Sequence, residues 1–127
     1  MIALLEKLLA IPSPTRHEKE IADFVRHWVG EYIAGSAISE LNNNVLIQLP
    51  FDETKPHICL VGHLDVVPEH FTPYQQDGHL HGSGASDMLG AVAVFLDVVA
   101  KHRDEILKNY NVSIFLYARE EQTPMNV

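Results

Sequence analysis

The chain has 127 residues, enough for one domain, and its 46% hydrophobic and 20% charged residues exclude wholesale disorder, a collagen-like chain and a coiled coil. Nine basic against seventeen acidic residues give a formal net charge of −8, which argues against nucleic acid or an anionic membrane as a partner. No apolar run approaches the roughly 18 residues of a membrane span, and the single cysteine, Cys59, excludes an internal disulfide and fits the reducing cytoplasm.

Two helices are expected at the start of the chain. The apolar residues of segment 1–10 recur at helical spacing and share one face. Thr15 followed by Glu18 indicates a capping box, which would open a second amphipathic helix that runs to about Ala34. Gly35 is suited to end that helix.

Short strands are expected next. Segments 37–41 and 45–49 flank a turn-like run of three asparagines and are candidate strands. The nearly continuous apolar run in 56–62 predicts a central strand that is buried on both faces. Cys59 lies in the middle of that run and is therefore expected to be an inert thiol in the core.

The second half of the chain indicates a strand–helix–strand unit. A long polar loop is expected over roughly 68–86, then a helix over about 88–102 and a buried strand over 112–118. Together with 56–62 this pattern predicts two parallel strands joined by a right-handed crossover. Ligands of such sheets bind beyond the carboxyl ends of the strands.

Polar side chains occupy that edge of the predicted sheet. Five of them follow a predicted strand or open the predicted helix: His63, Asp65, Asp87, Glu120 and Glu121. Imidazole and carboxylate groups that converge at one sheet edge suit zinc. His63 and Asp65 leave an extended backbone on the same side, so the carboxylate could hold the imidazole while the other ring nitrogen binds metal. Taken alone, each motif also fits a structural role, such as a helix N-cap at Asp87.

Glu120 and Glu121 are adjacent, so within a strand their side chains would point to opposite faces. Both can reach one site only if the chain leaves strand geometry, and the segment Gln122–Pro124 fits such an exit. One glutamate would then bind metal and the other would transfer protons. The alternative is a solvated strand end.

Two further motifs are expected to lie outside the chemistry. The glycine-rich run 82–87 resembles a dinucleotide fingerprint, but Asp87 replaces its third glycine and no strand of useful length precedes it. His79 and His81 alternate beside a turn and are expected at the rim of the site rather than among the metal ligands.

Three blocks of this sequence together resemble a known family. Segments 62–68, 77–88 and 113–121 are similar, in this order, to the signature blocks of the M20 zinc metallopeptidases and deacylases. The chain most resembles the succinyl-diaminopimelate desuccinylase subgroup, with acetylornithine deacetylases and dipeptidases near by. The resemblance implies an α/β fold, namely a three-layer α/β/α sandwich with a mixed, mainly parallel sheet.

The resemblance also implies a role for each polar residue of the site. His63 would bind one zinc ion, Asp87 would bridge two, and Glu121 would bind the second. Asp65 would orient the site, and Glu120 would be the general base. The implied cofactor is a pair of Zn²⁺ ions, for which Co²⁺ can substitute.

The chain departs from the family pattern at three positions. Ser83 stands where the family usually has arginine, Leu89 where it has lysine, and Arg119 where it often has aspartate. None of the three is a metal ligand, so the departures concern substrate choice and local electrostatics. Family members commonly have a cis peptide bond after the bridging aspartate, which corresponds here to Asp87–Met88.

Family members are several-fold longer than this chain. The resemblance therefore implies that residues 1–127 are the amino-terminal part of a catalytic domain. The carboxyl-terminal part of that domain, and a lid domain often used for homodimerisation, would be absent. The absent part would supply one more acidic ligand and a late histidine, so we expect this chain alone to be inactive and to bind zinc weakly.

The implied activity is zinc-dependent hydrolysis of an amide bond in an N-acyl amino acid, carried out by the full-length protein in the cytoplasm. The expected partner is a small N-acyl amino acid or a short peptide, with no nucleic acid and no membrane. Two alternatives stay open: a dipeptidase or aminopeptidase of the same fold, and a non-catalytic metal-binding or interaction module.

Overall fold

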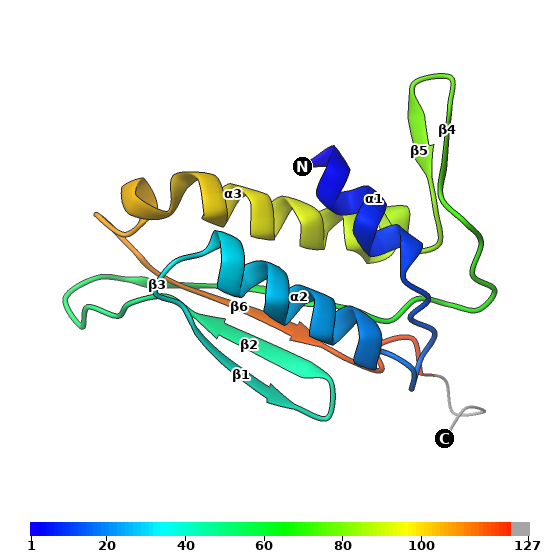
Figure 1. Ribbon diagram of the computed structural model, residues 1–127. Coiled ribbons are helices and arrows are strands. Elements are labelled where there is room, and N and C mark those ends of the chain that lie inside the picture. The colour runs from blue at the N-terminus through cyan, green and yellow to red at the C-terminus, as the bar shows by residue number, and fades with distance from the viewer. Residues whose placement is uncertain (123–127) are drawn as a thin grey trace.

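The computed structural model describes residues 1–122. In chain order its elements are α1 (Ile2–Ala10), α2 (Lys19–Tyr32), β1 (Ala37–Leu41), β2 (Asn44–Gln48), β3 (His57–His63), β4 (Tyr74–Gln76), β5 (His79–His81), the π-helical segment η1 (Ala85–Leu89), α3 (Gly90–Ile106) and β6 (Asn111–Tyr117) (Figure 1). The two early helices, the two short strands and the strand–helix–strand unit are therefore confirmed. The exit from strand geometry expected at Gln122–Pro124 lies partly outside the described residues.

The start of α2 differs from the prediction. The helix begins at Lys19, and its first turn has no side-chain cap. Instead of capping the helix, the Thr15 hydroxyl donates to Asp65, and the Glu18 carboxylate accepts the Arg16 N–H. The capping box was therefore a wrong prediction, because both side chains bond to groups outside the helix.

A four-stranded sheet in the order β1-β2-β6-β3 forms the centre of the fold. Strands β3 and β6 pair in parallel, as predicted, while β1–β2 and β2–β6 are antiparallel. The mixed sheet is confirmed, but in the described residues it is not mainly parallel. The tight turn at Asn42 and Asn43, whose positive φ values of 53° and 67° suit a two-residue hairpin, makes the β1–β2 pair antiparallel.

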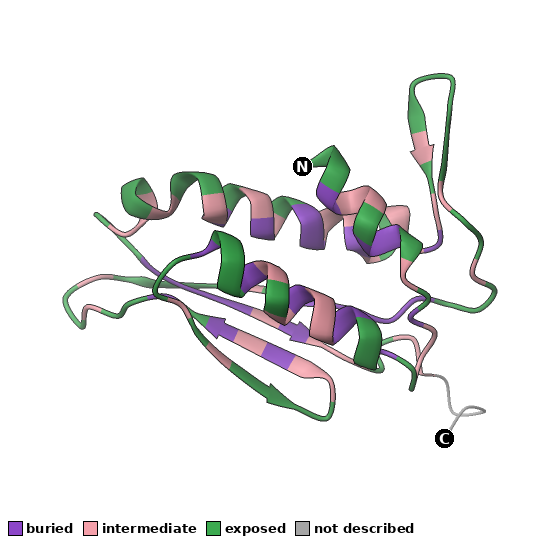
Figure 2. Cartoon of the chain, in the orientation of Figure 1, coloured by how far each residue is buried: buried purple, intermediate pink, exposed green. Residues whose placement is uncertain are grey.

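All three α-helices lie on one face of the sheet, and the core fills the space between these two layers (Figures 1 and 2). The buried sheet residues of that face include Val45, Ile47, Ile114 and Leu116. The opposite face has no covering element among the described residues, so two of the three expected layers are seen there. The third layer stays a prediction.

Strand β3 is not the buried central strand that its apolar sequence predicted. It lies at the edge of the described sheet, and five of its seven residues are exposed or half-buried. Val61 is 50% exposed, and Cys59 is an exposed free thiol rather than a core residue. The apolar run therefore marks a surface that the described residues leave uncovered.

The segment expected to be a polar loop contains a hairpin. Strands β4 and β5 pair through a turn in which Asp77 and Gly78 have φ values of 51° and 77°. An Asp-Gly pair is a strong hairpin signal, but the strands on either side are only three residues long. The hairpin projects from the end of the molecule near α1 (Figure 1). No helix in the described part of the chain has the length and apolarity needed to cross a membrane.

Candidate metal centre

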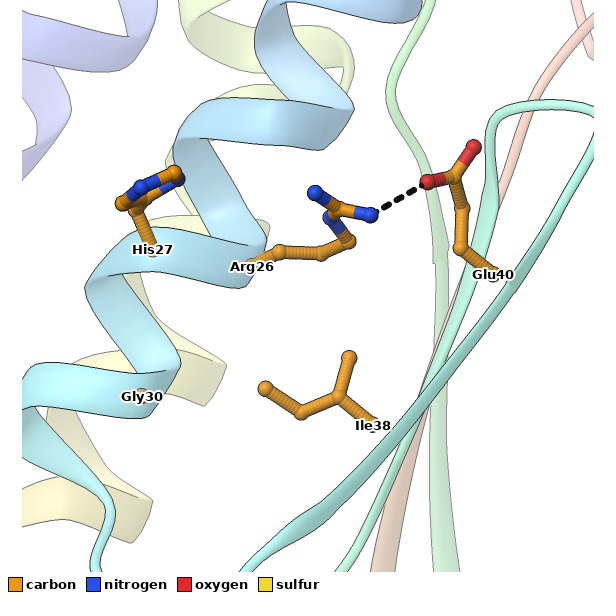
Figure 3. Close-up of a pocket in the computed structure, with 5 residues that line it drawn as sticks. All are labelled: Arg26, His27, Gly30, Ile38 and Glu40. Carbon is orange, nitrogen blue, oxygen red and sulfur yellow. Dashed lines mark hydrogen bonds and ion pairs between the residues drawn. The ribbon is translucent and has the colours of Figure 1, made fainter.

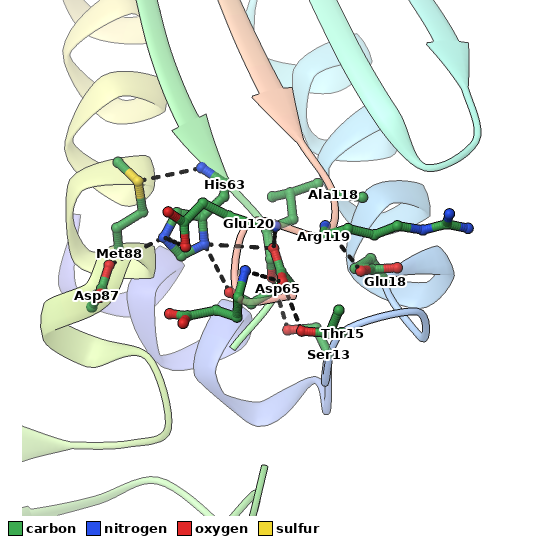
Figure 4. Close-up of polar contacts among 12 residues, drawn as sticks. Ser13, Thr15, Glu18, His63, Asp65, Asp87, Met88, Ala118, Arg119 and Glu120 are labelled. Atoms are coloured by element: carbon green, nitrogen blue, oxygen red, sulfur yellow. Dashed lines mark hydrogen bonds and ion pairs between the residues drawn. The ribbon is translucent and has the colours of Figure 1, made fainter. Parts of the chain in front are cut away.

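His63 is the last residue of β3 and is only 3% exposed. Its Nδ1 lies 2.9 Å from the Asp65 backbone carbonyl, which can only accept, so this nitrogen carries the proton. That leaves Nε2 as the free ligand atom, and it faces Asp87 Oδ1 at 3.1 Å and Glu120 Oε2 at 3.8 Å (Figure 4). The buried imidazole is thus oriented toward the carboxylates.

Asp87 enters the site from η1, immediately before α3. Its backbone is non-helical (φ −132°, ψ 97°), and its side chain is 77% exposed. The N-cap of α3 is Leu89, and the first turn of that helix has no side-chain cap. The structural alternative of an N-cap is therefore not supported. The Asp87–Met88 peptide bond is cis, as the resemblance implied, and the Met88 sulfur accepts the His63 backbone N–H at 3.3 Å.

Glu120 and Glu121 follow the end of β6. Arg119, the residue before them, has a φ of 66°, so the chain leaves strand geometry there, as both glutamates require. The Glu120 and Glu121 amides each donate to the Asp65 carboxylate at 2.9 Å (Figure 4). The two side chains are therefore both held at the edge of the sheet where His63 ends its strand.

Asp65 takes part in the site through different atoms from those expected. Its carboxylate oxygen Oδ1 is 3.6 Å from His63 Nδ1, whereas its backbone carbonyl makes the 2.9 Å hydrogen bond. The fully buried carboxylate accepts the Glu120 and Glu121 amides and the Thr15 hydroxyl. The carboxylate therefore orients residues 119–121, here called the glutamate turn, more directly than it orients the imidazole of His63.

Three of the predicted residues form a set of ligand atoms suited to a metal ion. One atom each from His63, Asp87 and Glu121 lies within 4.8 Å of the other two, and no other such group is found in residues 1–122. One imidazole nitrogen and two carboxylate oxygens are a donor set that zinc accepts. These residues therefore fit the implied metal.

The site concentrates negative charge. Burial raises the pKa of Glu121, and the neighbouring Asp87 and Glu120 carboxylates raise it further. The pKa of Tyr117 is raised by burial first and then by Glu120, Asp65 and Asp87. Carboxylates that raise the pKa of their neighbours favour a bound cation, which would compensate their charge.

A cavity of about 570 Å³ adjoins the candidate metal centre. Asp87 and Glu121 line one part of it, and Phe71, His79 and His81 line another. The two histidines are exposed residues of β5, which agrees with their expected place at the rim. The cavity thus opens directly onto the Asp87 and Glu121 carboxylates.

A second cavity, of about 480 Å³, lies between α2 and β1 (Figure 3). Arg26 and Glu40 form an ion pair of 2.8 Å across it, and Ile38 contributes an apolar wall. It shares no lining residue with the cavity beside Asp87.

Part of the site comes from the start of the chain, which no sequence pattern predicted. The Ser13 hydroxyl donates to the Leu64 carbonyl, and the Ser13 carbonyl accepts the Val66 N–H, so the segment before α2 runs beside the residues that follow β3. This places Thr15 and Glu18 next to the glutamate turn. No local signal could reveal this, because their partners lie 50 and 101 residues away in the sequence.

Comparisons with known proteins find a matching family profile and similar sequences. The family profile described as "Peptidase family M20/M25/M40" matches residues 59–126. The succinyl-diaminopimelate desuccinylase of Wolinella succinogenes is 37% identical over 108 residues, which cover 80% of this chain and 29% of the relative. The chain thus spans about a third of the length of the curated relatives it matches.

Solved structures show the same fold. Human carnosine dipeptidase 1 matches with a TM-score of 0.78 and 22% identity over 94% of this chain and 32% of its own. An M20 family metallo-carboxypeptidase from Sulfolobus solfataricus matches with a TM-score of 0.79 and 20% identity, over 94% of this chain and 31% of its own. A dinuclear metal binding peptidase from Bacillus subtilis matches with a TM-score of 0.73 and 17% identity, over 94% of this chain and 35% of its own.

Proposed function

We propose, from the premise that this chain belongs to peptidase family M20/M25/M40, that the protein hydrolyses the amide bond of an N-acyl amino acid with the help of two zinc ions. The observation that carries the proposal is the convergence of His63, Asp87 and Glu121, with Glu120 beside them. Bound zinc polarises a carbonyl group and makes water acidic enough to react near neutral pH.

The three ligand residues have distinct positions in this proposal. His63 and Asp87 would hold one zinc ion, and Asp87 and Glu121 would hold the other. The exposed Asp87 carboxylate would be shared by both because it has two oxygens, lies beside His63 and lines the cavity together with Glu121. The tautomer of His63 is set before any metal arrives, since Asp65 holds Nδ1.

Glu120 is the proposed general base. Its carboxylate lies 3.8 Å from His63 Nε2 and its side chain is 42% exposed, so it can reach both a water molecule and the leaving group at the same edge. It would take a proton from water and later deliver it to the leaving amine. Asp65 fixes the backbone from which Glu120 projects.

The Wolinella succinogenes relative supports an N-succinyl amino acid as the substrate. The cavity of about 570 Å³ next to Asp87 and Glu121 has room for a group of this size, and Val67, Phe71 and Leu80 give it apolar walls. The described residues that line it include no lysine or arginine. A carboxylate on the acyl group would therefore meet His79 and His81 there.

Residues 1–127 are proposed to be the amino-terminal part of the catalytic domain. Zinc takes three or four protein ligands in most sites, whereas the described cluster offers three residues for two ions. Further residues of a longer protein would complete both sites. The 127-residue chain alone is then expected to bind zinc weakly and to be inactive.

The test is a chimera in which this chain replaces the matching amino-terminal segment of the Wolinella succinogenes relative. With zinc, it should hydrolyse N-succinyl amino acids faster than N-acetyl amino acids or dipeptides. Glu120→Gln should lower turnover by about 10²–10⁴-fold and leave the zinc content unchanged. Glu105→Gln, at an exposed position of α3, is the matched control and should keep full turnover.

Three results would contradict the proposal. Near-normal turnover of Glu120→Gln would show that Glu120 is not the general base. A preference for dipeptides with free amino termini would favour the same-fold dipeptidase. Tight stoichiometric zinc binding by the 127-residue chain, with no hydrolysis by the chimera, would favour a non-catalytic metal-binding module.

A further inference from the structure

Glu18 is a fully buried carboxyl group that the proposed chemistry does not use. Its Oε1 accepts the backbone N–H groups of Arg16 at 2.8 Å and Arg119 at 3.2 Å. Its Oε2 lies 3.5 Å from Nδ2 of the Asn43 side chain. One side chain thus connects the start of α2, the β1–β2 turn and the end of β6. A buried carboxylate persists only when such hydrogen bonds replace water.

The Arg119 N–H is the first of three consecutive amides held in the same way. The Arg119 amide donates to Glu18, while the amides of Glu120 and Glu121 donate to Asp65 at 2.9 Å (Figure 4). Two buried carboxylates therefore fix the backbone of the glutamate turn along its whole length. The turn carries the base and one metal ligand of the proposed site.

Backbone conformation singles out the same hydrogen bonds. Arg16 and Arg119, whose amides both donate to Glu18 Oε1, have φ values of 78° and 66°. Non-glycine residues rarely adopt this left-handed conformation, and they keep it where surrounding contacts demand it. Glu18 supplies such a contact to both residues.

We propose that Glu18 is a positioning residue, which aligns Glu120 and Glu121 with His63 and Asp87 by holding the Arg119 amide. This inference rests on the proposed metal site but not on its substrate. Glu18 touches none of the ligand side chains in the described contacts, so it acts through the backbone of the turn. The property that matters is the reach of Oε1 rather than the charge of the carboxylate.

Three substitutions at Glu18 distinguish the effect of the position of Oε1 from the effect of the negative charge of the carboxylate. Glu18→Gln keeps an oxygen at the Oε1 position and should bind Co²⁺ within a few-fold of the wild type. Glu18→Asp keeps the carboxylate but shortens the side chain, and Glu18→Ala removes it. Both should weaken Co²⁺ binding by about 10-fold or more, the usual effect of losing a partner that orients a ligand.

Asn111→Ala is the matched control. Asn111 is 2% exposed and makes three hydrogen bonds to Asp52 and Lys55 at the opposite end of β6. Its loss also removes a buried polar network, so it should lower stability while leaving the Co²⁺ affinity of the folded chain unchanged. Affinity is measured by titration of the 127-residue chain, with folding of each variant checked by circular dichroism.

Backbone amide NMR gives the second readout. In metal-free Glu18→Asp the amide signals of Arg119, Glu120 and Glu121 should shift, and in Glu18→Gln they should stay close to the wild type. If the wild type binds no Co²⁺, the metal site proposed within this chain fails, and these shifts still decide whether Glu18 holds the turn. Unchanged amide shifts in folded Glu18→Asp would overturn the inference, as would a larger loss of affinity in Glu18→Gln than in Glu18→Asp.

Discussion

Asp65 shows how one buried side chain can serve two neighbouring parts of a site. Its backbone carbonyl selects the tautomer of His63, and its carboxylate fixes the amides of Glu120 and Glu121. The residue is fully buried, so its acceptor oxygens are shielded from competing water. Both functions depend on acceptor oxygens, which makes Asp65 sensitive to the loss of a single one.

We predict that Asp65→Asn destabilises the metal-free chain by about 1–3 kcal/mol, because the new amide group puts a donor in place of one buried acceptor oxygen and one N–H of the turn loses its charged acceptor. Co²⁺ affinity should fall by about 10-fold or more, because the turn positions Glu121. Urea unfolding and Co²⁺ titration measure the two effects. Thr15→Val removes a hydroxyl that donates to Asp65 but leaves both carboxylate oxygens of Asp65 in place. It should therefore lower Co²⁺ affinity less than Asp65→Asn does. Equal affinities for Asp65→Asn and the wild type would contradict this role.

At the scale of the elements, the segment that leads into Asp87 is tightly packed at Gly84. Gly84 has a φ of 81°, and a Cβ at this position would collide with the Val66 side chain and lie 3.3 Å from the Asp87 carbonyl. Gly78, in the β4–β5 turn, has a similar φ of 77° but nothing within 4 Å of the same point. The two glycines thus share a backbone conformation but differ in the free space that a Cβ would find.

Gly78→Ala should therefore cost about 1–2 kcal/mol of unfolding free energy, the cost of a left-handed conformation alone. Gly84→Ala should cost about 1–3 kcal/mol more, because the packed neighbours must move. Urea unfolding of both variants measures the difference. Equal losses would mean that the segment before Asp87 is not packed as described.

The turn that precedes β3 should make stability depend on pH. Hydrogen bonds from Thr54 and the nearby Lys55 hold the pKa of Asp52 at about 2, below its ordinary value of 3.8. The charged carboxylate is thus favoured in the folded state, and its contribution is present above the unfolded pKa and lost as pH falls toward the folded one.

The difference in unfolding free energy between the wild type and Asp52→Asn should therefore be constant above about pH 5 and shrink between about pH 4 and pH 2. Thr54→Val should narrow that window, since it removes the hydroxyl donor. Chemical unfolding at a series of pH values measures both. A difference that stays constant down to pH 2 would show that Asp52 is not stabilised in this way.

Local patterns predicted most of these elements. The helical spacing of 1–10, the strand signal of 112–118 and the strand–helix–strand order all appear in the structure, because each depends on neighbouring residues. The convergence of His63, Asp87, Glu120 and Glu121 was also predictable, since parallel strands bring their carboxyl ends to one edge.

The rest depends on contacts that are distant in sequence. Thr15 and Glu18 match a capping box, but their hydrogen-bond partners are Asp65 and Arg119. Cys59 lies in an apolar run that indicates burial, yet its exposure is set by whether another layer covers the sheet. No local pattern carries that information.

On the scale of the whole molecule, the described chain is a two-layer assembly with one open sheet face. Exposed apolar residues such as Ile58 and Val61 lie on its edge strand. The chain covers about a third of its curated relatives, and the proposed centre has three ligand residues for two ions. The three proposed metal ligands are nonetheless brought together by the described residues alone.

The central claim is that His63, Asp87 and Glu121 bind a divalent metal ion, and calorimetric titration of the 127-residue chain with Zn²⁺ tests it most directly. We expect weak but saturable binding that falls by at least about 10-fold in His63→Ala and in Glu121→Gln. His81→Ala, which removes an exposed histidine from the rim of the neighbouring cavity, should bind as the wild type does. Absence of saturable binding, or equal losses in His63→Ala and His81→Ala, would contradict the account.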